Sequence, residues 1–113
     1  MKAYTDLEQS KKLAEILPME SADMYYQAYY DSKNNLRYIP RFSSTFVPFK
    51  IDIPAWNLAT LLSVLPKGTN ISTPKPTNEL SYCCWNQYDE IYASNPVDAC
   101  YEMIIKLHEQ ELL

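Results

Sequence analysis

The fold class of this chain is decided by the stretch Asn95-Pro96-Val97-Asp98-Ala99-Cys100-Tyr101-Glu102-Met103-Ile104-Ile105-Lys106-Leu107, which has the pattern of an amphipathic helix. Asn95 can cap this helix, and Pro96 suits its first position because a missing N–H costs nothing there. Asp98 places a negative charge near the positive end of the helix dipole. The side that we expect to be buried carries Val97, Cys100, Met103, Ile104 and Leu107.

Two short strands are expected before this helix, at about Leu80 to Trp85 and Tyr88 to Ala93, joined by Asn86-Gln87. The stretch that precedes them, Lys67 to Asn78, combines one glycine with two asparagines and two prolines. These residue types favour turns, so we predict a loop there.

A second helix is expected to begin at Pro54 and to end where Pro66 and Gly68 follow it. Its leucines recur at three- and four-residue spacing and form a face that we expect to pack on a sheet. They are Leu58, Leu61, Leu62 and Leu65. The run before this helix, Thr45 to Ile53, contains Pro48, which cannot donate to a strand ladder, so we predict an edge strand or an extended connector.

The chain begins with a third predicted helix, because Thr5-Asp6-Leu7-Glu8 has the form of a capping box. This helix ends at Pro18 and turns Leu13, Ala14, Ile16 and Leu17 toward the core. Two aromatic-rich runs follow it, Met24 to Tyr30 and Leu36 to Phe42. The polar turn from Asp31 to Asn35 separates them, so we predict a hairpin.

These elements together predict an α+β fold in which three helices pack with an antiparallel sheet of four to five strands, in the order α-β-β-(β)-α-β-β-α. The chain has 113 residues, of which 47% are hydrophobic, and this suits one core. Residues 1–113 are therefore expected to form a single α+β domain. The pattern leaves open whether the helices cover one face of the sheet or both, and which face of the Tyr25–Tyr30 strand is buried.

Charge and cysteine content indicate a cytoplasmic protein. The net charge is -4, which repels phosphate backbones and anionic membranes, so nucleic acid is disfavoured as a partner. No apolar run is long enough to span a bilayer, and Met1 to Leu17 lacks the pattern of a signal peptide, so we expect no membrane association. Two of the three cysteines are adjacent, which is a poor basis for disulfides, so we expect free thiols.

Three segments of the chain carry a resemblance to a known group of proteins. They are Leu7 to Pro18, Trp56 to Pro66 and Asn95 to Ile104, one for each predicted helix, while Tyr25 to Ile53 matches least. The chain resembles small uncharacterised proteins encoded by phages and prophage elements of gut Bacteroidetes, and its layout is more loosely similar to phage α-β-α sandwich domains. The resemblance implies a phage-derived cytosolic protein and carries over no activity and no active-site residue.

Candidate catalytic and metal-binding groups do not converge in the sequence. His108 lies eight residues after Cys100 on one predicted helix, about 12 Å along its axis, so the two cannot form a dyad. Cys83 and Cys84 point to opposite faces of a strand, and no Cys-x-x-Cys is present. One glycine cannot build a phosphate-binding loop. We therefore assign no catalytic, cofactor-binding or metal-binding residue, expect no cofactor, and favour a protein that is not an enzyme.

The carboxylates are interpreted as solvated charges. Asp89 and Glu90 are neighbours on a predicted strand and therefore face apart. Glu102 and Lys106 are four residues apart on the exposed side of the last helix, where we expect them to pair. Paired-carboxylate catalysis needs two side chains in one pocket, and this spacing does not provide it.

Aromatic density is the unusual feature of the chain. Within 25 residues it places Tyr25, Tyr26, Tyr29, Tyr30, Tyr38, Phe42, Phe46 and Phe49, interleaved with Lys33, Arg37, Arg41 and Lys50. In a hairpin Tyr26 and Tyr30 share one face and Tyr25 and Tyr29 the other, so both faces carry rings and only one can belong to the core. The candidate binding surface is Tyr25, Tyr26, Tyr29, Tyr30, Arg37, Tyr38 and Arg41.

Three interpretations of this surface compete. Tyrosine is enriched at protein interfaces, so the first is a protein partner, either a second copy in a homodimer or a host factor. The second is a single-stranded nucleic-acid platform over Tyr25–Phe49, with rings stacking on bases and cations meeting phosphate. The third is that the strands merely pack beneath the helices with hydroxyls reaching water. We predict the first, a small phage-type protein that acts by protein–protein binding, and keep an enzyme as the minority alternative.

Overall fold

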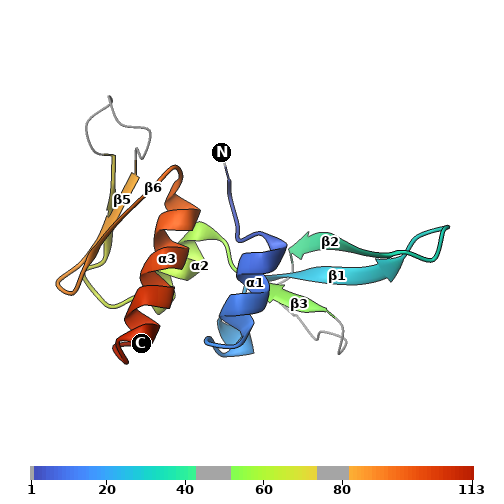
Figure 1. The fold of residues 1–113 in the computed structure, drawn as a ribbon, viewed down its shortest axis with the longest axis horizontal. Coiled ribbons are helices and arrows are strands. Elements are labelled where there is room, and N and C mark those ends of the chain that lie inside the picture. Colours follow the sequence, from blue (N-terminus) through green and yellow to red (C-terminus); the bar gives the residue numbers. More distant parts are fainter. Residues whose placement is uncertain (1, 43–51, 74–81) are drawn as a thin grey trace.

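Three helices lie between two small antiparallel sheets, one at each end of the molecule (Figure 1). The structure is a computed structural model that describes residues 2–42, 52–73 and 82–113. Its elements are α1 (Leu7–Ala14), a 3-10 turn (Met19–Ser21), β1 (Met24–Tyr30), β2 (Leu36–Phe42), β3 (Ile53–Ala55), α2 (Leu58–Val64), β4 (Asn70–Ser72), β5 (Tyr82–Trp85), β6 (Glu90–Ala93) and α3 (Pro96–Glu109). The α+β prediction is confirmed, but the prediction of a single sheet of four to five strands is wrong.

Each of two hairpins takes up a third strand that lies next to α2 in the chain. The strand orders are β2-β1-β3 in one sheet and β4-β5-β6 in the other, with antiparallel neighbours throughout. Since β3 precedes α2 and β4 follows it, the helix separates the two extra strands. The hairpin over Met24–Tyr30 and Leu36–Phe42 is confirmed at both boundaries.

Helix α3 forms as its sequence predicts. Asn95 Oδ1 accepts a hydrogen bond from the backbone N–H of Asp98 at 2.8 Å, and Pro96 occupies the first turn. All five residues expected on the buried side are buried. The helix covers one face of β5 and β6, and α2 packs mainly against α3, not against a sheet as expected.

Two helix starts lie a few residues from their predicted positions. The box that caps α1 is formed by Asp6 and Gln9, since Asp6 Oδ1 accepts from Gln9 N at 2.8 Å and Gln9 Oε1 accepts from Asp6 N at 3.1 Å. Thr5 is instead buried. Helix α2 starts after Asn57, whose side chain caps it, and Pro54 lies in edge strand β3, where a missing N–H is tolerated.

Strand β4 was missed because its pairing is not local. Asn70–Ser72 falls within the predicted loop from Lys67 to Asn78 and pairs with β5, Ile71 lying opposite Cys84. Asparagine and serine have low strand propensity, so only the partner strand reveals it. Positions 45–51 of the predicted edge strand or connector, and positions 74–78 of the predicted loop, lie outside the described residues.

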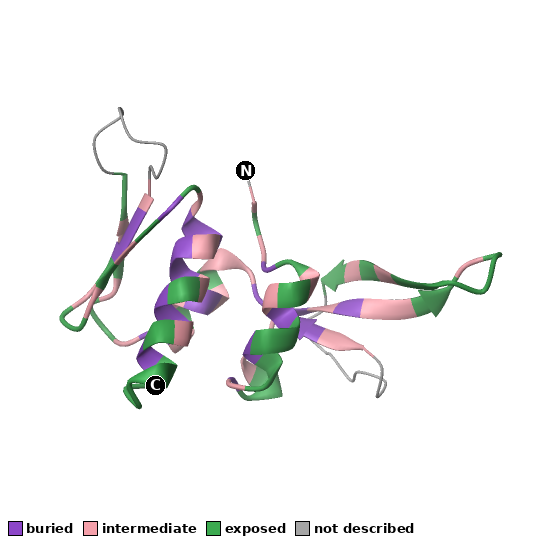
Figure 2. Cartoon of the chain, viewed as in Figure 1, coloured by how far each residue is buried: buried purple, intermediate pink, exposed green. Residues whose placement is uncertain are grey.

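Helix α1 contributes to both apolar cores. The larger core joins Leu13 of α1 to α2, α3 and the completely buried Trp56. The smaller core lies beneath the hairpin and consists of Met24, Tyr26 and Ala55, with Tyr4 and Leu7 packed on it. Figure 2 shows buried residues concentrated on α3 and at the ends of β1 and β3 nearest the helices, whereas the far end of the hairpin is exposed.

A polar cluster ties the start of α1 to the start of α3. The Lys2 ammonium lies 2.7 Å from Asp98 Oδ1 and 2.9 Å from Asp6 Oδ2. Gln9 Nε2 donates to Asp98 Oδ1 at 2.8 Å. These contacts bring the two halves of the chain together near their helix N-termini, where carboxylates are favoured. Within the described ranges, none of the helices has the length and apolar character needed to span a bilayer.

Candidate protein-binding surface

The candidate surface is carried by the hairpin of β1 and β2. Its turn is closed by Asp31, whose Oδ1 accepts from the backbone N–H groups of Lys33 and Asn35, both at 2.9 Å. Asn34 has a φ of 62°, a left-handed conformation that asparagine tolerates. A turn fixed in this way sets the register of the two strands.

The register divides the hairpin into two faces. Directly opposite residues share a face, and faces alternate along each strand. We define the inner face as Met24, Tyr26, Ala28, Tyr30, Leu36, Tyr38, Pro40 and Phe42, and the outer face as Tyr25, Gln27, Tyr29, Arg37, Ile39 and Arg41.

Helix α1 and the segment before it cover only the near part of the inner face. Tyr26 is buried there, its hydroxyl donates to the Thr5 carbonyl at 2.8 Å, and burial raises the pKa of Tyr26 to about 12. The Lys11 ammonium lies 5.9 Å from the centroid of the half-buried Tyr38 ring. Beyond α1 the strands continue without cover from the described residues, and Tyr30 is 62% exposed.

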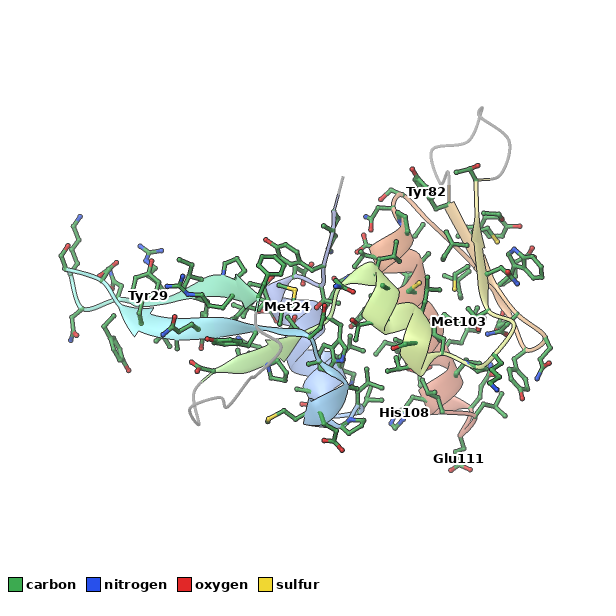
Figure 3. The ribbon with its side chains drawn as sticks, turned by 180° about the vertical axis from the view of Figure 1, so that it is seen from behind. Met24, Tyr29, Tyr82, Met103, His108 and Glu111 are labelled. Atoms are coloured by element: carbon green, nitrogen blue, oxygen red, sulfur yellow. The ribbon has the colours of Figure 1, made fainter. Side chains whose placement is uncertain are left out.

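The outer face is not covered by any described element. Figure 3 shows Met24 close to the helices and Tyr29 toward the far end of the hairpin. Tyr29 is 45% exposed and Ile39 36% exposed, and with Gln27 and Arg41 they line a shallow hollow of about 280 Å³. Arg41 Nε donates to Gln27 Oε1 at 2.9 Å, which holds the guanidinium against the sheet.

The cations of the hairpin are not equivalent. Arg37 Nε lies 3.1 Å from Asp31 Oδ2, so its charge is partly neutralised. Arg41 has no carboxylate within ion-pair distance among the residues that the structure describes. Arg41 is therefore the cation on the outer face that has no ion pair with a described residue.

The free edge of the hairpin is a poor place for another strand to add. Strand β2 is at the edge of its sheet, and Pro40 lies within it. The Ala28 N–H donates to Asp52 Oδ1 at 3.0 Å, on the side of β1 away from β2. Alternate residues of a strand point their N–H groups to the same side, so Tyr26 also points away from β2, and the residue opposite it, Pro40, faces the open edge of β2. Because Pro40 has no N–H, this edge lacks a hydrogen-bond donor at that position. Strand addition at this edge is thus disfavoured.

The structure separates the seven predicted surface residues. Tyr25, Tyr29, Arg37 and Arg41 lie together on the outer face, and Tyr30 and Tyr38 lie on the inner face. Tyr26 belongs to the core, so its place on the predicted surface is corrected. The prediction missed Gln27 and Ile39, which lie directly opposite each other. The hairpin register could have revealed them, because both lie between the predicted Tyr and Arg positions. Phe46, Phe49 and Lys50 lie outside the described residues.

The groups with catalytic potential are dispersed. His108 is exposed in the last turn of α3, where its Nδ1 lies 3.3 Å from the Leu113 carbonyl oxygen. The three cysteines are free and buried; Cys84 and Cys100 meet between β5 and α3, and the contact with Cys84, together with burial, raises the pKa of Cys100. Cys83 lies on the opposite face of β5, 3.9 Å from Glu90 Oε1. No cluster of three metal-ligating side chains occurs in residues 2–42, 52–73 and 82–113.

The expected pair of Glu102 and Lys106 is replaced by a different one. The Lys106 ammonium lies 3.0 Å from Asp89 Oδ2, at the turn before β6. The pair of Lys106 and Asp89 links α3 to its sheet. An i,i+4 pair of Lys106 with Glu102 would lie within the helix and would not make this link. Comparison with family models, with curated proteins and with solved structures finds no match to this chain.

Proposed function

We propose that this protein acts by binding another protein through the outer face of its hairpin. The observation that carries the proposal is the extension of the hairpin beyond its own core. The Cα radius of gyration is 15.2 Å, against about 13 Å for a compact chain of this length, and the longest dimension is 47 Å. A chain that extends an aromatic strand pair away from its core places apolar surface where a second molecule can cover it.

The residue types on the outer face support a protein partner. Tyrosine and arginine are enriched at the centres of protein interfaces, where a few well-packed side chains supply most of the binding energy. Here Tyr29, Ile39 and Arg41 are presented by a paired strand scaffold. Because Arg41 is already held by Gln27, binding immobilises few additional rotamers.

Single-stranded nucleic acid is less well supported. A stacking platform needs cations along its whole length to follow the phosphates. Of the two arginines on the outer face, Arg37 is engaged by Asp31, and the net charge of the chain is -4. These charges favour a polypeptide over a polyanion.

The proposal also includes a cellular setting. The three cysteines are buried and form no disulfide. Reduced thiols of this kind are usual in the cytosol, which supports a cytoplasmic location. The resemblance of the helical segments to phage-encoded proteins supports a host protein or a second copy as the partner. We assign the protein no catalytic role.

A matched pair of variants tests the proposal. Tyr29 and Tyr88 are each 45% exposed, one on the hairpin and the other near the opposite end of the molecule. We expect Tyr29→Ser to weaken binding by about tenfold or more and Tyr88→Ser to leave it unchanged. Binding is measured in two ways, as self-association by sedimentation and as proteins retained from a bacterial lysate on the immobilised chain. Equal behaviour of the two variants in both assays contradicts the proposal.

A further inference from the structure

We infer that the outer face of the hairpin docks into a groove on α3 of a second copy of this chain. This inference rests on the proposed function and identifies its partner. The groove is lined by Ile91, Tyr101, Glu102, Ile105, Lys106 and Glu109, and its volume is about 310 Å³. The outer face and this groove, two surfaces of one chain, are complementary in charge and in apolar character.

The groove combines apolar side chains with a row of charged side chains along α3. Ile91 of β6 and the pair Tyr101 and Ile105 of α3 form its apolar part, and all three are half-buried. Residues four apart on a helix lie one above the other, so Tyr101 and Ile105 form a continuous ridge. This apolar part can receive the exposed parts of the hairpin side chains Tyr29 and Ile39.

The charges of the groove have the opposite sign to those of the outer face. The Lys106 ammonium is neutralised by Asp89 at 3.0 Å. Glu102 and Glu109 are exposed, and neither has a lysine or arginine within ion-pair distance in the described part of the chain. The groove is thus left negative, and the outer face is left positive by Arg41. An arginine facing carboxylates across a partly desolvated contact forms strong, directional hydrogen bonds.

Charge also selects between the two ways in which copies can meet. If two outer faces packed on each other, the arginines of one copy would lie against those of the other, and like charges there are unfavourable. Docking of the outer face on the groove pairs opposite charges instead. The hairpin and β6 lie at opposite ends of the long axis (Figure 1). Two copies that lie side by side with antiparallel long axes can therefore make the contact twice and close as a dimer.

The decisive experiment uses charge reversal on each side of the contact. Sedimentation velocity is measured at low salt, where surface charges are least screened, from about 10 µM to 1 mM protein. The wild-type chain is expected to dimerise over this range. Arg41→Glu alone and the double variant Glu102→Arg/Glu109→Arg alone are each expected to weaken dimerisation at least tenfold, because both contacts then face like charges.

Mixing the two variants should restore the complex. In the mixed dimer each outer face meets a groove of opposite charge, at both contacts, so the mixture is expected to form a dimer with one copy of each variant. Lys33→Glu is the matched control, since it makes the same charge change at the exposed turn, and it should leave dimerisation within about twofold of wild type. Far-ultraviolet circular dichroism verifies that every variant is folded.

Two results overturn the inference, and both can be separated from failure of the proposed function. The first is a wild-type chain that is monomeric throughout the concentration range. The second is a mixture of variants that associates no better than each variant alone. If Tyr29→Ser still abolishes retention of another protein in either case, the proposed function stands and only the choice of a second copy is wrong. If it abolishes neither kind of binding, both are wrong.

Discussion

The two sheets of this molecule have the same number of strands and the same antiparallel pairing, yet among the described helices α3 covers β5 and β6 of one sheet, whereas α1 covers only the near end of the other. Each consists of three antiparallel strands. The β4-β5-β6 sheet packs one face along α3, and the inward side chains Cys84 and Ala93 are buried there. The β2-β1-β3 sheet is covered by α1 only at its near end, and Tyr30 beyond it is 62% exposed. Helix and strand lengths together make the difference, because α3 has 14 residues over strands of 4 residues, whereas α1 has 8 residues over strands of 7.

The apolar burial that stabilises the fold is therefore concentrated at one end of the molecule. Apolar burial is the main favourable contribution to folding, and most of the fully buried side chains lie in the core around α3. The far half of the hairpin buries little and contributes correspondingly little. Its rings are then available for a contact that the chain cannot make by itself.

The largest difference in stability between the two ends is expected when a buried side chain is truncated. Leu107 of α3 has no exposed surface, so Leu107→Ala should lower the free energy of unfolding by about 3 kcal/mol through lost burial and a residual cavity. Tyr30→Ala, at the uncovered end, should change it by less than about 0.5 kcal/mol. Urea unfolding of dilute protein measures both. Comparable losses in the free energy of unfolding for the two variants would contradict the proposed difference between the two ends.

A smaller difference in stability is expected between two tyrosines on the inner face of β1. The Tyr26 hydroxyl donates to the buried Thr5 carbonyl at 2.8 Å, so Tyr26→Phe leaves this oxygen with only the longer, 3.5 Å contact to Ser10 Oγ and should cost about 1 kcal/mol. Tyr30→Phe removes the same atom from an exposed ring and should cost nothing measurable. Thermal unfolding of the two variants compares the covered and uncovered halves of β1. A greater loss of thermal stability for Tyr30→Phe than for Tyr26→Phe would contradict the position that we give to the boundary of the core.

The link between the two ends should be sensitive to acid. Burial acts to raise the pKa of Asp98, but hydrogen bonds from Lys2, Gln9 and Asn95 outweigh it and lower the pKa from its usual 3.8. A carboxyl with a lowered folded pKa contributes stability that is present above its unfolded pKa and lost as the pH falls through the folded pKa. This contribution is therefore complete at pH 7 and disappears below about pH 4.

The corresponding variant is Asp98→Asn. Because the Asp98 side chain is 28% exposed, we expect a loss of only about 1 kcal/mol at pH 7, and the difference from wild type should shrink at about pH 3. Glu20→Gln, at an exposed carboxylate outside both the cluster and the groove, is the control and should show little effect at either pH. Urea unfolding at the two pH values measures the change, and a loss that is independent of pH would contradict the role given to this cluster.

The sequence predicted what local signals determine. Helix α3 carries its own cap and apolar side, and the hairpin carries a turn centred on Asp31, so both were predicted at their observed positions. Strand β4 and the division into two sheets depend on which distant strands pair, and Asn70–Ser72 contains no sign of its partner. For the candidate surface, ring density led to the prediction of Tyr29 and Tyr30, which are exposed, but the burial of Tyr26 depends on where α1 lies, which the strand itself does not encode.

The most direct test of the uncovered outer face is a photo-crosslink at single positions. A photoreactive phenylalanine derivative replaces Tyr29 in one chain and Tyr88 in another, two sites that are equally exposed at opposite ends of the molecule. After irradiation of cells that make each chain, covalent adducts are resolved by electrophoresis and identified by mass spectrometry. Our account predicts protein adducts from position 29 in clear excess over those from position 88. Adducts of equal yield from both positions, or none from position 29, would contradict it.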